Sequence, residues 1–123
     1  MCELEQKRER IINWIKALRS GEYKQGKHAL CYDNAYCCLG VAGKLANVSL
    51  SEDGCNYVTI QNRYGLKNEA GLYGKTELGY TKALSSDNDN GASFDAIADL
   101  IESNPPDLFV PELEAYLKEN PLS

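Results

Sequence analysis

The chain has 123 residues, of which 43% are hydrophobic and 25% are charged, and its net charge is −5. This length and composition predict one globular domain over residues 1–123 and exclude a disordered chain. The negative charge disfavours nonspecific nucleic-acid binding, because that activity needs clustered Lys and Arg to displace counterions from phosphates.

No apolar run approaches the roughly 20 residues of a membrane-spanning helix, and the start, MCELEQKRER, lacks the apolar centre of a secretory signal. We therefore expect a cytoplasmic protein with no membrane partner, and a homo-oligomer stays open. Five cysteines in a reducing compartment are expected to stay thiols.

The net charge hides an asymmetry along the chain. Residues 1–48 hold eight Lys and Arg against five Asp and Glu, whereas residues 49–123 hold five against thirteen. A basic first half of this kind could bind one small anionic ligand.

The first predicted element is an amphipathic helix over residues 3–19. Its apolar side chains recur at helical spacing, at Leu4, Ile11, Ile12, Ile15 and Leu18. Gly21 can supply a left-handed C-cap after Arg19, whose charge suits the helix dipole.

The middle of the chain predicts short elements. His28 to Tyr32 favours a strand, Tyr36 to Ala46 a buried helix that contains Gly40 and Gly43, and Tyr57 to Ile60 a further strand. The rest of residues 49–92 predicts short strands and long loops, and the run SSDNDNG, residues 85–91, predicts a polar turn.

Two helices are expected near the C-terminus. Ser93 can cap one that includes Phe94 to Ile101, and Pro111 suits the first turn of another. The predicted fold class is α+β, with an N-terminal helix, a small antiparallel sheet from His28 to about Leu84, a buried Gly-containing helix and two C-terminal helices.

The adjacent cysteines Cys37 and Cys38 favour packing over chemistry. Their spacing is not that of a Cys-x-x-Cys redox pair. Together with His28 and Cys31 they also lack the two closely spaced ligand pairs, such as Cys-x2–4-Cys and His-x3–5-His, of a structural zinc site. No phosphate loop, zinc-protease motif or nucleophile elbow occurs. We predict no catalytic residue, no metal site and no cofactor.

One cluster combines charge, aromatic side chains and flexible backbone near the end of the first helix. Arg19 and Lys27 could contact phosphate there, and Tyr23 could stack on a ring. Together with polar or aromatic side chains elsewhere, the predicted ligand-binding residues are Arg19, Tyr23, Gln25, Lys27, Tyr36, Asn88 and Asp89. A solvated helix end with dipole-compensating cations is the alternative.

Three runs, WIKALRSGEYKQGKHAL, AYCCLGVAGKLA and DNDNGASFDAIADLIE, resemble a family of small proteins encoded widely by bacteriophages and prophages. The chain departs from the commoner family pattern after Val41, where Ala-Gly-Lys replaces a frequent Leu-Cys-Asp. The resemblance implies a phage origin, a cytoplasmic host setting and a small α+β domain without an assigned function.

These observations lead to one hypothesis and two alternatives. The hypothesis is a non-enzymatic phage accessory protein that sequesters a small anionic ligand, with a nucleotide signal of host defence as the first candidate. The alternatives are an inhibitor or DNA mimic that presents acidic C-terminal residues such as Glu112, Glu114 and Glu119 to a host protein, and a small nucleotide hydrolase.

Overall fold

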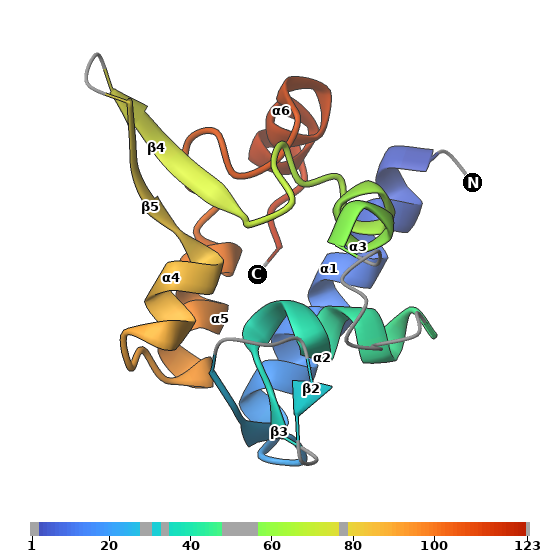
Figure 1. The fold of residues 1–123 in the computed structure, drawn as a ribbon. Coiled ribbons are helices and arrows are strands. Elements are labelled where there is room, and N and C mark those ends of the chain that lie inside the picture. The colour runs from blue at the N-terminus through green and yellow to red at the C-terminus, as the bar shows by residue number, and fades with distance from the viewer. Residues whose placement is uncertain (1–2, 28–30, 33–34, 48–56, 77–78, 123) are drawn as a thin grey trace.

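The computed structural model describes residues 3–27, 31–32, 35–47, 57–76 and 79–122. These form helices and short strands (Figure 1), which confirms the predicted α+β class. In chain order the elements are α1 (Glu3–Ser20), β1 (Lys24–Gln25), β2 (Cys31–Tyr32), β3 (Ala35–Tyr36), α2 (Cys38–Leu45), α3 (Tyr57–Tyr64), β4 (Leu72–Thr76), β5 (Gly79–Ala83), α4 (Leu84–Asp89), α5 (Phe94–Glu102) and α6 (Pro111–Glu119).

Helix α1 is the central element, because it contacts α2, α3, α5 and α6. Its predicted apolar face is confirmed, with Ile11, Ile15 and Leu18 buried around a fully buried Trp14. The ring N–H of Trp14 donates to the Cys38 carbonyl at 2.9 Å, so the largest core side chain buries no unpaired polar atom. The helix ends before Gly21, whose φ of 77° is the predicted left-handed conformation.

Helix α2 is buried from Cys38 to Gly43, as its glycines predicted. It begins two residues later than expected. Tyr36 belongs to β3, and Cys37 has the extended backbone of an N-cap. The predicted boundary was therefore wrong by two residues, because Tyr36 pairs in a sheet before the helix starts.

Two small sheets accompany the helices. Strand β3 pairs in parallel with β1 and antiparallel with β2, and β4 pairs antiparallel with β5. Figure 1 shows β4 and β5 extending away from the helices at the upper left. The expected strand over residues 28–32 is seen at Cys31–Tyr32, and residues 28–30 lie outside the described part.

Two predicted elements between residues 57 and 91 were wrong. The expected strand at Tyr57 to Ile60 is the start of α3, because Ile60 and Tyr64 recur at a helical spacing of four and are both buried. The expected polar turn at residues 85–91 is largely helix α4, in which Leu84 and Asn88 are buried at the same spacing.

The two C-terminal helices are confirmed. The Ser93 hydroxyl accepts the backbone N–H of Ala96 at 3.1 Å as an N-cap, and Pro111 occupies the first turn of α6. None of the helices in the described ranges is long and apolar enough to cross a bilayer.

Candidate functional site

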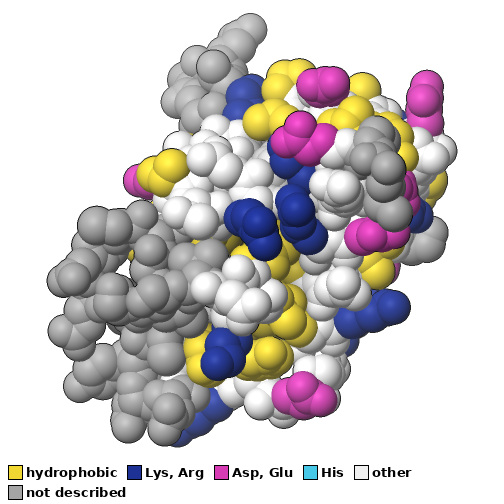
Figure 2. All heavy atoms as spheres, turned by 90° about the vertical axis from the view of Figure 1, so that its right-hand side faces the viewer, with side chains coloured by type: hydrophobic (Ala, Val, Ile, Leu, Met, Phe, Trp, Pro, Cys, Tyr) yellow, Lys and Arg dark blue, Asp and Glu magenta, His cyan; other side chains and the backbone are white. Residues whose placement is uncertain are grey.

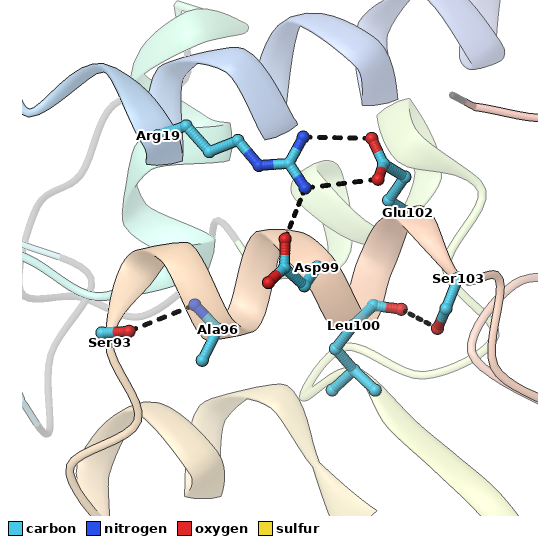
Figure 3. Close-up of polar contacts among 7 residues, drawn as sticks. All are labelled: Arg19, Ser93, Ala96, Asp99, Leu100, Glu102 and Ser103. Atoms are coloured by element: carbon cyan, nitrogen blue, oxygen red, sulfur yellow. Dashed lines mark hydrogen bonds and ion pairs between the residues drawn. The ribbon is translucent and has the colours of Figure 1, made fainter.

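Arg19, the first predicted ligand contact, is paired within the protein. Its guanidinium donates to the Glu102 carboxylate at 3.0 and 3.3 Å and to the Asp99 carboxylate at 2.6 Å, and Figure 3 shows it directed across to α5. The hydrogen bonds to Glu102 and then Asp99 raise the pKa of Arg19. Its charge is therefore used to join the end of α1 to α5.

Gln25 and Asn88 lie together, and their amides bond to each other. Asn88 is fully buried, and its Oδ1 accepts from the Gln25 side chain at 2.9 Å and from the Cys38 backbone N–H at 3.2 Å. Its Nδ2 donates to the Gly26 carbonyl at 2.7 Å, while Gln25 also donates to the Ala92 carbonyl at 2.7 Å. In this structure both side chains join α4 to β1 and to the start of α2.

Two further predicted residues adjoin this pair, because Tyr36 is the strand partner of Gln25 and the Asp89 carboxylate lies 3.5 Å from the Asn88 side-chain nitrogen. Tyr23 and Tyr36 meet edge to face, with ring centroids 5.5 Å apart, and both are half-buried. Lys27 is exposed, and Asp89 is partly buried next to Asn88. Arg19 is thus held in an ion pair with α5, whereas the amide network, its strand partner Tyr36 and Asp89 adjoin one another, and the role of these residues in ligand binding stays a prediction.

Cys37 and Cys38 are free, buried thiols. The Cys37 sulfur accepts the Gly40 backbone N–H at 3.3 Å as the N-cap of α2, and the Cys38 thiol contacts the Leu84 carbonyl at 3.5 Å. Burial raises the pKa of both thiols, so they are poor nucleophiles at neutral pH. The described residues contain no cluster of three metal-ligating side chains, and His28 lies outside them.

The capping role of Cys37 gives a stability prediction. Replacing Cys37 with alanine removes the acceptor for the Gly40 N–H and is expected to lower the free energy of unfolding by about 1 kcal/mol. The matched variant Cys37→Ser keeps an acceptor and is expected to lose less. Urea unfolding followed by circular dichroism measures both. Equal losses in the two variants would contradict the capping role.

A pocket of about 360 Å³ lies elsewhere, between α1, α2 and α3. Its lining residues come from one face of α1 and from the C-terminal ends of the other two helices, and they are Arg10, Asn13, Leu45, Ala46, Arg63 and Tyr64. Arg10 and Asn13 share a face because they are three residues apart on a helix. Figure 2 views the side of the molecule that carries α3, where Lys and Arg side chains border exposed apolar ones.

The floor of this pocket is Tyr64, which is 2% exposed. Its hydroxyl donates to the Ala42 carbonyl at 2.7 Å, and its ring packs at a tilt on Trp14 with centroids 5.1 Å apart. Burial raises the pKa of Tyr64 to about 12, so the phenol stays neutral at physiological pH. Tyr64 therefore holds α3 against α2 and gives the pocket an uncharged base.

Arg10 of α1 and Arg63 of α3, the two arginines of the pocket, differ in their partners from Arg8 and Arg19 of α1. Arg8 pairs with Glu5, and Arg19 pairs with two carboxylates. Arg10 instead donates to the Arg63 carbonyl at 3.1 Å, where a cation also suits the C-terminal end of α3. Among the described residues, neither Arg10 nor Arg63 has a carboxylate partner, so most of their N–H donors are available to an anion.

This pocket was not predicted from the sequence. The N-terminal helix was expected, but nothing in its pattern separates Arg10 from Arg8 and Arg19. The local sequence around Arg63 predicts strands and loops, so it does not indicate the position of Arg63 beside α1. The available signal was the basic character of residues 1–48, which supply four of the six lining residues.

The chain was compared with protein families, curated proteins and solved structures. Neither a curated protein nor a solved structure matches it. A family model described as a domain of unknown function, DUF8296, matches residues 7–78, which is more than half of the chain. All six lining residues of the pocket fall inside this segment, whereas Asn88, Asp99 and Glu102 fall outside it. The chain therefore belongs to the DUF8296 family of domains of unknown function.

Proposed function

We propose that this protein binds a small anionic ligand in the pocket between α1, α2 and α3 and sequesters it. The supporting observation is that Arg10 and Arg63, which have no carboxylate partner in the described structure, line a pocket with the Asn13 amide and the apolar or aromatic side chains of Leu45, Ala46 and Tyr64. Such a pocket, with a few convergent polar groups, is the usual form of a small-molecule site. The phage-like motifs extend the proposal to a phage accessory protein that removes a nucleotide signal in the host cytoplasm.

The lining residues support binding over catalysis. The described pocket residues include no carboxylate, imidazole or thiol that could accept a proton at neutral pH. The one hydroxyl among them, on Tyr64, is neutral and already donates to the Ala42 carbonyl. Binding without a general base favours retention of an unchanged ligand. Release of an unaltered nucleotide on heating, checked by chromatography, would distinguish sequestration from the hydrolase alternative.

The binding proposal predicts the effect of removing either charge. Differential scanning fluorimetry against linear and cyclic nucleotides is expected to identify a stabilising ligand, because a ligand at 100 times its Kd adds about 2.7 kcal/mol to stability. For that ligand, Arg10→Gln and Arg63→Gln are each expected to weaken the Kd at least tenfold by calorimetry, through loss of about 1.5 kcal/mol of charged hydrogen bonding.

Two control variants locate the site. Lys16→Gln removes an equal charge from an exposed position of α1 that does not line the pocket, and it is expected to bind as the wild type does. Lys27→Gln tests the cluster that the sequence predicted. Absence of stabilisation by any nucleotide or small carboxylate at millimolar concentration, or loss of binding in Lys27→Gln with retention in Arg10→Gln, would contradict binding in this pocket.

The acidic surface of α6 favours a second candidate, an inhibitor of a basic host protein. Glu112 and Glu119 are exposed, whereas Glu114 accepts from the Asp107 backbone N–H at 2.9 Å and lies 3.7 Å from Lys118. A partner held by these charges would be recovered from host lysate at low salt and released at high salt. Equal recovery by Glu112→Gln/Glu119→Gln and by the wild type would exclude this face.

A further inference from the structure

The charges around the pocket limit the charge of a ligand that it can neutralise. It lies at the C-terminal ends of α2 and α3, and each helix end carries about −0.5 elementary charge. Arg10 and Arg63 bring two positive charges, so the sum over the described lining residues and the two helix ends is about +1. A ligand with one negative charge would be matched there. A second negative charge would meet helix carbonyl ends without a further cation among the lining residues.

The pocket is small, and one of its walls is apolar. A volume of about 360 Å³ is near the lower end of the roughly 300 to 1,000 Å³ found for ligand sites. Leu45 is 38% exposed at the pocket, although the α2 residues from Cys38 to Gly43 are buried. With Ala46 it forms an apolar wall. The pocket therefore suits one compact apolar or aromatic body.

Asn13 can hydrogen-bond to the polar edge of such a body. Asn13 is exposed at the pocket, and its amide makes no hydrogen bond to the described part of the chain. An amide supplies both a donor and an acceptor, which is what the edge of a heterocyclic ring requires. Asn13 stands three residues from Arg10 on α1, so a ligand held by Arg10 would also lie within reach of this amide.

We infer that the ligand is a compact monoanion, in which a single phosphodiester or carboxylate is attached to one ring system, as in a cyclic mononucleotide. The inference rests on the proposed function and narrows its ligand class. It sets aside nucleoside triphosphates, which carry too much charge, and cyclic dinucleotides, which carry two charges and two bases. Arg10 and Arg63 contact the anionic group and Leu45 packs on the ring. The Asn13 amide hydrogen-bonds to the polar edge of the ring.

Calorimetry of the full chain at fixed salt tests this inference with cyclic AMP, AMP, ATP, cyclic di-AMP and benzoate as probes. Cyclic AMP or benzoate is expected to bind at least tenfold more tightly than ATP and cyclic di-AMP, and whichever of the two is tighter identifies the anionic group. Tighter binding of ATP or cyclic di-AMP that still depends on Arg10 would overturn the inference but support the proposed function. Absence of binding by every probe would contradict both.

A variant with an added positive charge also tests the match between the charge of the pocket and the charge of the ligand. Asn13→Lys places a third cation at an exposed helical position, where lysine is tolerated, and Gln6→Lys, which adds the same charge at an exposed α1 position outside the pocket lining, is the control. The ratio of AMP to cyclic AMP affinity is expected to rise at least fivefold in Asn13→Lys and to stay near the wild-type value in Gln6→Lys. An unchanged ratio in Asn13→Lys would show that charge does not select the ligand.

Discussion

Replacement of Asn88 with leucine is expected to lower the free energy of unfolding by about 3 to 4 kcal/mol, although the two side chains are similar in size. The Asn88 amide is fully buried and satisfies both the Cys38 N–H and the Gly26 carbonyl. Leucine would leave both groups without a partner, at a cost of about 1 to 3 kcal/mol each. Urea unfolding at neutral pH, followed by circular dichroism, measures the loss.

The neighbouring Asn90 provides the matched control for Asn88. Asn90 is exposed at the end of the same helix, and only its backbone takes part in the helix cap. Asn90→Ala is expected to change the free energy of unfolding by no more than about 0.5 kcal/mol. A loss below about 1 kcal/mol in Asn88→Leu would mean that water replaces the amide and that α4 is not joined to α2 through Asn88.

Alkaline pH is expected to destabilise the protein between pH 10 and 12 by roughly 2 to 3 kcal/mol through Tyr64. Burial raises the pKa of this phenol from its ordinary value of 10 to about 12. The unfolded chain therefore loses the proton near pH 10, while the folded chain keeps it. The stabilisation is fully present below pH 10 and is lost as the pH rises through 12. Tyr73, whose pKa burial and the Asp87 hydrogen bond also raise, adds a loss of the same sign.

Urea unfolding at several alkaline pH values, with tyrosinate absorbance as a second signal, measures this dependence. Tyr64→Phe is the control, because it keeps the ring that packs on Trp14 and removes only the ionisable hydroxyl. The variant is expected to be about 1 kcal/mol less stable at neutral pH, through loss of the bond to Ala42, and to lose less stability above pH 10. Identical pH slopes in variant and wild type would contradict a neutral, buried Tyr64.

Regular periodicity explains which elements could be predicted. Helix α1 repeats its apolar positions over 18 residues, and Ser93 and Pro111 stand at helix starts as their chemistry requires. Helix α3 has only eight residues, and its β-branched start resembles a strand. Its helical form depends on burying Ile60 and Tyr64 against the rest of the core, which is long-range information that a local pattern does not contain.

The same limit explains why the pocket was missed. Arg19, Gln25 and Lys27 are close in sequence, and this proximity suggested one site. In the fold Arg19 turns to α5 and Gln25 turns to Asn88, so neighbours in sequence serve different contacts. Arg10 and Arg63 are 53 residues apart and meet only because α3 packs on α1. A buried asparagine such as Asn88 likewise has the same appearance in a sequence as an exposed one.

We expect the pocket between α1, α2 and α3 to bind a compact anion. A crystal structure of the protein grown with cyclic AMP tests it most directly. The expected result is ligand density with its phosphate between Arg10 and Arg63 and its ring against Leu45. Density beside Tyr23 and Lys27, with the pocket between the three helices empty, would contradict this expectation. It would indicate that the ligand binds at the predicted cluster after α1.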